Sequence, residues 1–141
     1  MDTPKHSVSV AAVITDDQGR ALLIQRRDNG RWEPPGGVLE LDETLEEGLR
    51  REIREETGLD IEPGHISGVY KNMPRGIIAL VFRCKITGGE LGVTDETAAY
   101  RWADEHAIRE LAAEAYAIRV LDALRADATP AVRHHDGIHL L

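Results

Sequence analysis

The segment that most constrains the fold is a short stretch with start and stop signals for a helix. Thr44 and Glu47 have the Thr-x-x-Glu spacing of a capping box, in which each side chain bonds to the backbone of the other residue. Gly58 suits the position just after a helix, where the backbone turns left-handed. We therefore predict one helix from Thr44 to Thr57.

The acidic residues of this helix are unusually placed. Its apolar residues form a stripe that must face the core: Leu45, Leu49 and Ile53. Glu52 and Glu56 fall in the same arc as this stripe, and Glu55 lies at its border. Carboxylates at a core edge lose hydration unless a cation compensates, and no Lys or Arg occupies this arc. Oxygen ligands at i+3 and i+4 spacing predict a Mg²⁺ or Mn²⁺ site; the alternative is an ordinary salt-bridged helix.

Two neighbours add to this prediction. Arg51 stands four residues after Glu47 and four before Glu55, so it can hold a carboxylate in a fixed orientation. Gly48 is one turn before Glu52 and has no side chain, which would leave space for a metal-bound phosphate.

The first part of the chain predicts strands and a long loop. Residues Ser7 to Ile14 and Ala21 to Gln25 have strand patterns, and the turn residues between them favour a hairpin. A loop is expected from Arg26 to Asp42, because its glycines and prolines resist regular structure.

The second part predicts more strands and one further helix. Strands are expected at Asp60 to Tyr70, Gly76 to Lys85 and Ala99 to Trp102, with a turn at Gly88-Gly89. Asp104 can cap a helix whose apolar residues recur every three or four positions: Ile108, Leu111, Ala115, Ile118 and Leu121. Residues 127–141 are expected to be a C-terminal tail, whose histidines are bland rather than a metal site: His134, His135 and His139.

Length and composition favour one folded domain over residues 1–141, of α/β (α+β) class with α/β/α layers. A net charge of −8 disfavours nucleic-acid binding, although cations in an acidic site can bridge to a polyanion. The chain has no apolar run of the ~20 residues that a membrane helix needs, and no signal peptide, which predicts a cytoplasmic protein. Cys84, the single cysteine, lies in an apolar run and is expected to be buried.

The segment Gly37 to Leu59 resembles a known motif. It reads Gly37, five residues, Glu43, seven residues, and then Arg-Glu-Ile-Arg-Glu-Glu-Thr-Gly-Leu from Arg51. This resembles the Nudix box, Gly-x5-Glu-x7-Arg-Glu-U-x-Glu-Glu-x-Gly-U with U aliphatic, at every specified position. Gly37 and Gly58 match its fixed glycines and are expected to support its shape.

The resemblance implies an α/β/α sandwich with a mixed sheet. It also implies Mg²⁺-dependent hydrolysis of a diphosphate linkage in a nucleoside diphosphate-X or nucleoside triphosphate. The implied metal ligands are Glu52, Glu55, Glu56 and the backbone carbonyl of Gly36. Arg51 and Glu43 look like the pair that braces the loop against the helix. The general base is left open among three carboxylates, those of Glu55, Glu56 and Glu96.

Residues outside the box are expected to bind the rest of a small nucleotide-like substrate. Arg26, at the end of a strand, is a candidate for phosphate contact, and Trp32 and Arg75 are candidates for the remaining groups. The Ala-rich helix near Ala112 to Leu124 has apolar residues on more than one side, which makes a homodimer possible.

Three other functions are consistent with the same scaffold. A nucleotide-sensing or partner-binding module would have no reason to keep the full set of acids. An isopentenyl diphosphate isomerase would need a cysteine near the site, and Cys84 is the only candidate. An RNA decapping enzyme would favour a basic patch, which this acidic chain lacks.

Overall fold

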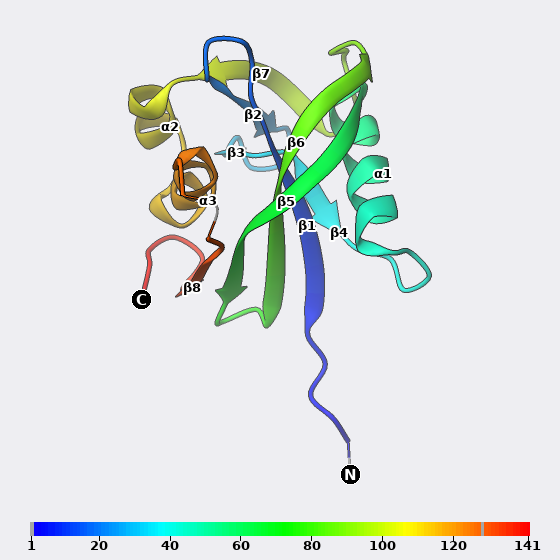
Figure 1. Cartoon of the computed structure of the whole chain (residues 1–141). Coiled ribbons are helices and arrows are strands. Elements are labelled where there is room, and N and C mark those ends of the chain that lie inside the picture. The colour runs from blue at the N-terminus through cyan, green and yellow to red at the C-terminus, as the bar shows by residue number, and fades with distance from the viewer. Residues whose placement is uncertain (1, 128) are drawn as a thin grey trace.

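The computed structural model describes residues 2–127 and 129–141 and shows strands between two groups of helices (Figure 1). In chain order the elements are β1 (Ser7–Ile14), β2 (Ala21–Arg26), β3 (Trp32–Glu33), β4 (Gly36–Val38), α1 (Leu45–Thr57), β5 (Leu59–Asn72), β6 (Ile77–Gly89), β7 (Thr97–Ala103), α2 (Glu105–Leu111), α3 (Glu114–Leu124) and β8 (Ala131–His135).

The strands form two sheets. The larger has the order β4-β1-β6-β5-β8, and the smaller has the order β3-β2-β7. In the larger sheet β1 pairs with β6, and β5 with β8, in parallel, whereas β1–β4 and β5–β6 are antiparallel. The predicted mixed sheet is therefore confirmed.

The core has two halves, one on each face of the larger sheet. Alternate residues of β1 point to opposite faces, as the twofold repeat of a strand requires. Val10, Ala12 and Ile14 pack in the cluster that includes Leu49 and Ile53 of α1. Ala11 and Val13 pack in the other cluster, with residues of α2 and α3. This layering confirms the predicted α/β/α sandwich, with α1 on one side and α2 and α3 on the other (Figure 1).

The predicted hairpin between the first two strands is wrong. The turn between them forms, with the Gly19 N–H donating to the Asp16 carbonyl at 3.1 Å, but only the Thr15–Ala21 bridge pairs the two sides. β1 then continues in the larger sheet and β2 in the smaller one. Local turn residues predict the reversal of the chain; the partner of a strand buried on both faces is set by distant segments.

The predicted loop from Arg26 to Asp42 contains two short strands, β3 and β4. Each pairs with a strand that precedes it in the chain, β3 with β2 and β4 with β1. Between them Pro34 and Pro35 are buried, and the Pro35 carbonyl accepts from the Ala12 N–H at 2.9 Å. Proline and glycine content marked the segment as irregular, but both residue types are tolerated in short edge strands.

The predicted turn at Gly88-Gly89 lies instead inside β6, where these residues pair with Asp60 and Leu59. β5 and β6 are longer than predicted, and register shifts between Asp60 and Gly68 bend β5. The extra length escapes the sequence pattern because such bulges interrupt the alternation of apolar and polar residues.

The predicted helix after Asp104 is two helices. Asp104 caps α2 as expected, with its Oδ1 accepting from the Ala107 N–H at 2.9 Å. The backbone then becomes extended at Ala112 (φ −99°, ψ 146°) and Ala113 (φ −62°, ψ 152°) before α3 begins. Alanine favours helix, so no residue here signals the break.

The prediction of a C-terminal tail over residues 127–141 is also wrong. Strand β8 pairs in parallel with β5 from Gly68 to Asn72. His135 is fully buried, whereas His134 and His139 are exposed. In the described residues, the histidines join no cluster of potential metal ligands. β8 is short and two of its five residues are exposed, so its apolar pattern is weak.

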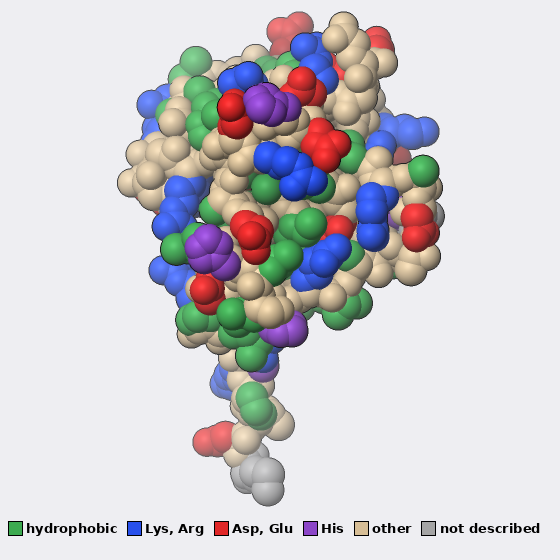
Figure 2. All heavy atoms as spheres, turned by 90° about the vertical axis from the view of Figure 1, so that its left-hand side faces the viewer, with side chains coloured by type: hydrophobic (Ala, Val, Ile, Leu, Met, Phe, Trp, Pro, Cys, Tyr) green, Lys and Arg blue, Asp and Glu red, His purple; other side chains and the backbone are tan. Residues whose placement is uncertain are grey.

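The face formed by α2, α3 and β8 mixes charged side chains of both signs with hydrophobic ones (Figure 2). Cys84 is buried as predicted, and burial raises the pKa of its thiol to about 12, far from nucleophilic use at neutral pH. None of the helices in the described residues has the length and apolarity to cross a membrane.

Candidate active site

Helix α1 is fixed at both ends as the sequence predicts. Thr44 Oγ1 accepts from the Glu47 N–H at 3.1 Å, and Glu47 Oε1 accepts from the Thr44 N–H at 3.0 Å. Gly58 follows the helix with φ 81°, a left-handed conformation that favours glycine. The last turns of α1 are thereby held against β5, and the acidic side chains they carry have a defined direction.

Three carboxylates meet at one point. Oxygen atoms of Glu52, Glu56 and Glu96 all lie within 4.8 Å of one another. Glu52 and Glu56 are one turn apart on α1, and Glu96 comes from the loop before β7. Convergence of like charges in a partly buried place costs free energy unless a cation neutralises it.

Of the three carboxylates, that of Glu56 lies in the least favourable environment for a negative charge. Only 5% of the surface of this residue is exposed to solvent. Burial raises the pKa of Glu56 to about 8, and the negative charges of Glu52 and Glu33 act in the same direction. Among the described residues, no Lys or Arg forms an ion pair with Glu56. The free protein therefore holds this carboxyl protonated over much of the neutral range.

The glycines of β4 allow the sheet edge to approach the acids. A Cβ on Gly37 would lie 2.6 Å from Oε1 of Glu52, and closer still to its Cδ. A Cβ on Gly36 would lie 2.6 Å from Cα of Ala11 in β1. The Gly36 position therefore requires glycine, because a Cβ would meet the backbone of β1, whereas a Cβ at Gly37 would displace the Glu52 carboxylate; Gly37 places the β4 backbone directly beside that carboxylate.

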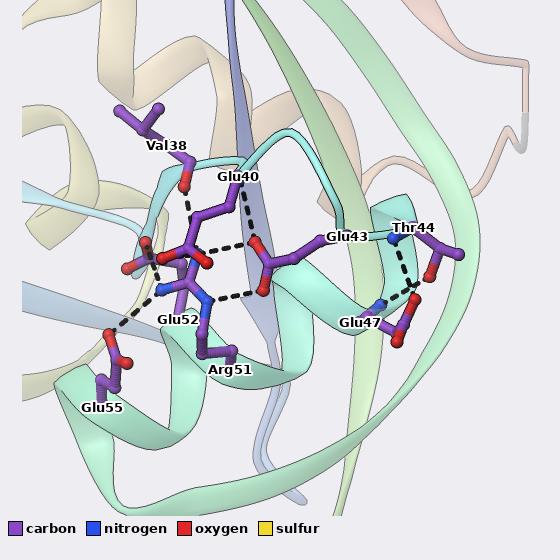
Figure 3. Close-up of polar contacts among 8 residues, drawn as sticks. All are labelled: Val38, Glu40, Glu43, Thr44, Glu47, Arg51, Glu52 and Glu55. Atoms are coloured by element: carbon purple, nitrogen blue, oxygen red, sulfur yellow. Dashed lines mark hydrogen bonds and ion pairs between the residues drawn. The ribbon is translucent and has the colours of Figure 1, made fainter.

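Arg51 joins the acidic side of α1 to the preceding loop (Figure 3). Its Nε donates to Glu43 Oε2 at 2.6 Å and its Nη2 donates to Glu43 Oε1 at 2.8 Å, a two-pronged ion pair. Its Nη1 donates to Glu52 Oε1 at 3.0 Å, and its Nη2 also reaches the Val38 carbonyl at 3.2 Å. One guanidinium thus fixes both the loop and a carboxylate of the cluster.

Glu55 lies outside the cluster. Its side chain is 52% exposed, and its Oε2 accepts from Arg51 Nη1 at 3.2 Å (Figure 3). The structure therefore brings together only two of the three box glutamates that were expected to converge. Gly48 also differs from expectation: it faces Leu39 and Glu43 of the loop, which fill the space that was expected for a phosphate.

Hydroxyl groups of β7 hold the end of α1, a contact that no local sequence pattern predicts. The backbone carbonyl of Glu56 accepts from Thr97 Oγ1 at 3.0 Å, and the single proton of the Tyr100 hydroxyl is shared between this carbonyl at 2.7 Å and that of Gly92 at 2.6 Å. Thr97 adjoins Glu96, so these bonds fix the loop acid relative to the helix acid. We call Thr97, Tyr100 and the Glu56 carbonyl the carbonyl clamp. Their separation in the chain hides the contact from any local pattern.

The carboxylates line a cleft of about 610 Å³. Its other walls come from β2, β4 and the loop before β7, and the residues with side chains or backbone at its surface include Ile24, Arg26, Arg27, Gly36, Gly37 and Asp95. Arg26 pairs with Asp28 at 2.7 Å and with Glu33 at 3.1 Å. The cleft therefore combines acids that can hold cations with arginines that can contact phosphate.

The two other expected substrate residues lie apart from this cleft. Trp32 is half-buried in β3 and packs against the core cluster on the α2 and α3 side. Arg75 is exposed, and it lines two further cavities that also include Arg26. Of the expected substrate-binding residues, only Arg26 borders the carboxylates directly.

Comparisons with known proteins agree with this architecture. The family model described as NUDIX domain matches residues 5–124. A MutT-like protein of Streptomyces ambofaciens is 56% identical over 98% of this chain and 89% of its own length. An ADP-ribose pyrophosphatase of Methanocaldococcus jannaschii is 38% identical over 75% of this chain and 66% of its own. The crystal structure of an ADP-ribose pyrophosphatase from Streptococcus suis covers 91% of this chain and 99% of its own, at a TM-score of 0.76 and 22% identity, a similarity of fold.

Proposed function

We propose that this chain hydrolyses a diphosphate linkage in a nucleotide-like substrate with the help of Mg²⁺. The premise is that the chain belongs to the Nudix family and is a Nudix pyrophosphohydrolase. The observation that carries this proposal is the convergence of Glu52, Glu56 and Glu96 within 4.8 Å at the cleft. Mn²⁺ is an expected substitute, since both ions prefer hard oxygen ligands.

The residues present fit a divalent cation. Glu56 is buried without a basic partner among the described residues, and burial raises its pKa to about 8. Removing a carboxylate from water in this way is unfavourable unless a positive charge is bound nearby. When bound, Mg²⁺ would neutralise the diphosphate and lower the pKa of a water molecule. We assign Glu52 and Glu56 as ligands, with the Gly36 carbonyl as a further one.

The attacking water must lose a proton, and the carboxylates near the cleft can accept it. Glu96 comes from a loop and is exposed, whereas Glu56 is buried. Glu55 remains a proposed ligand or base from the family resemblance, although in this structure it bonds to Arg51. Arg51 acts as a positioning residue, because it holds Glu52 while it is itself held by Glu43.

Arg26 and Arg27 are proposed to contact the phosphates. Both line the cleft together with the acids, and a planar guanidinium suits a phosphate oxygen pair. Arg26 has two carboxylate partners in the structure, so a substrate phosphate would compete with Asp28 and Glu33 for its donors. The remainder of the substrate is expected to lie on the Arg75 side. A cytoplasmic location and a homodimer stay predictions.

The test is the substitution Glu56→Gln, with Glu46→Gln as the matched control on the exposed first turn of α1. We expect Glu56→Gln to lower Mg²⁺-dependent hydrolysis of nucleoside diphosphate-linked compounds by roughly 10²-fold or more. EDTA should have the same effect on the wild type, whereas Glu46→Gln should keep full activity. A Glu56→Gln protein as active as the wild type would rule out this assignment. Identification of the products in ¹⁸O-labelled water would locate the phosphorus that is attacked.

A further inference from the structure

A second, smaller cavity adjoins the acidic cleft. It has a volume of about 230 Å³ and shares Arg26 and the β4 residues Gly36 to Val38 with the cleft, so both border the same edge strand. Away from the acids it is lined by Glu33, Tyr116 and Arg119. A substrate whose diphosphate lies at Glu52 and Glu56 has room to place one of its end groups here.

Arg119 is a buried cation with an unused donor. The residue is 8% exposed, and in the described part of the chain no carboxylate forms an ion pair with it. Its Nε is buried and has no hydrogen-bond partner among these residues. A buried N–H without an acceptor is costly, and a buried charge without a counter-ion is more so. Such a group in a native structure needs an explanation, and a bound ligand is one.

The surroundings of Arg119 are short of acceptors. Its Nη2 lies 3.1 Å from Nε2 of His135, and the Gly137 N–H donates to Nδ1 of the same ring at 3.0 Å. Burial lowers the pKa of His135, so the ring is neutral, and a neutral imidazole has only one acceptor nitrogen. The ring can therefore accept from only one of these two donors, whichever tautomer forms, and Nε–H of Arg119 is a further donor without a partner among the described residues.

The guanidinium is held in a fixed place. Its Cζ lies 4.7 Å from the ring centroid of Tyr116 and 5.4 Å from that of Tyr70. Tyr70 is itself anchored, since its hydroxyl donates to Asp122 at 2.8 Å. The aromatic contacts stabilise the cation but accept none of its in-plane N–H bonds. Those donors are left for a planar acceptor that lies at the edge of the guanidinium.

Glu33 places an acceptor in the same cavity. Its Oε1 accepts from Arg26 Nη1 at 3.1 Å, and no hydrogen bond among the described residues uses its Oε2. Its negative charge is near enough to act on Arg119. The cavity therefore offers a donor from Arg119 and an acceptor from Glu33.

On the basis of the proposed function, we propose that this cavity binds the nucleobase of the substrate and that Arg119 selects a 6-keto purine over adenine. Hypoxanthine and guanine present a carbonyl oxygen at C6 beside an N1–H donor, which complements Arg119 and Glu33. Adenine presents an amino donor at C6 beside an unprotonated N1, which reverses the pattern and sets its amino group against the guanidinium. Sites that read bases by hydrogen bonds discriminate in this way.

Inosine and adenosine nucleotides give the sharpest test, because at C6 and N1 they differ as the proposal requires and elsewhere they are identical. We expect the metal-free wild type to bind IMP roughly tenfold to a hundredfold more tightly than AMP in titration calorimetry. Equal affinities, tighter binding of AMP, or no measurable binding of either nucleotide would overturn the proposal. This measurement involves no hydrolysis, so its result is independent of whether the proposed reaction occurs.

A substitution then tests the residue. Arg119→Met keeps the length of the side chain and removes its donors, and Arg109→Met is the control at an exposed arginine of α2. We expect Arg119→Met to bring the IMP to AMP affinity ratio close to one, and Arg109→Met to leave it unchanged. A ratio that survives Arg119→Met would show that Arg119 is not the selecting residue. If Arg119→Met fails to fold, the wild-type comparison of IMP with AMP decides the proposal by itself.

Discussion

At the scale of single residues, Glu56 has requirements that conflict. It must be charged to bind a cation, yet burial and the neighbouring charges of Glu52 and Glu33 raise its pKa to about 8. The folded protein without metal therefore favours the protonated form, whereas in the unfolded chain the carboxyl has the ordinary glutamate pKa of 4.5. Active sites often hold groups in such unfavourable environments, at some cost to the stability of the fold.

This conflict predicts a pH dependence of stability. Because the folded-state pKa of Glu56 is above the unfolded value, its contribution is fully present below about pH 4.5 and is lost as the pH rises through about 8. In EDTA, we expect the free energy of unfolding of the wild type to fall relative to that of Glu56→Gln between these pH values. Urea unfolding of both proteins across the pH series measures this difference.

Mg²⁺ provides the control for that experiment. At pH 8 the ion should raise the unfolding free energy of the wild type more than that of Glu56→Gln, since it binds the folded state through the ionised carboxylate. Parallel pH curves for the two proteins in EDTA would contradict the raised pKa of Glu56.

At the scale of elements, the carbonyl clamp joins α1 to β7. The C-terminal carbonyls of a helix need donor partners outside it, and here the Thr97 and Tyr100 hydroxyls lie within hydrogen-bonding distance of the Glu56 carbonyl. The clamp has a functional consequence as well as a structural one. It fixes the distance between an acid carried by a helix and an acid carried by a loop.

We predict that the double substitution Thr97→Val and Tyr100→Phe raises the Mg²⁺ concentration for half-maximal activity several-fold. Each lost hydrogen bond is worth about 0.5–1.5 kcal/mol, so the loop acid should become less well placed while the fold persists. Titration of activity with Mg²⁺ measures the effect. Thr87→Val, at an exposed threonine of β6, is the matched control. A double variant with the Mg²⁺ dependence of the wild type would show that the clamp has no part in placing Glu96.

At the scale of the whole molecule, the last strand completes the sheet and contacts Arg119, a residue that lines the smaller cavity. β8 covers the edge of β5 over five residue pairs. Its final residue, His135, is fully buried beside Arg119. The C-terminal segment is therefore part of the folded core, in contrast to the exposed residues 2–6 at the other end of the chain.

Ending the chain at Asp127 should consequently destabilise the protein, by at least about 2 kcal/mol, since a paired strand and a buried side chain are removed together. Thermal unfolding followed by circular dichroism measures the loss. Deletion of residues 2–5, which lie outside every strand and helix, is the control and should leave the midpoint unchanged. A truncated protein as stable as the full chain would mean that β8 adds nothing to the fold.

The sequence by itself determined helix α1. Its first and last residues, the glycine that ends it, and the position of Glu52 and Glu56 on its apolar side all depend on residues within one or two turns. The pairing of Arg51 with nearby acids is equally local, because i+4 spacing on a helix brings side chains together. Such features can be predicted because their partners are close in the chain.

Only the tertiary structure decided the partners of β1, the place of Glu96 in the cluster, the position of Glu55 outside it and the burial of Arg119 beside His135. Strand pairing and cavity walls join residues that are far apart in the chain, and several arrangements satisfy the same local pattern. The packing of both sheet faces selects one of them. Acids and arginines can be read from the sequence, but which of them face a common cleft depends on that packing.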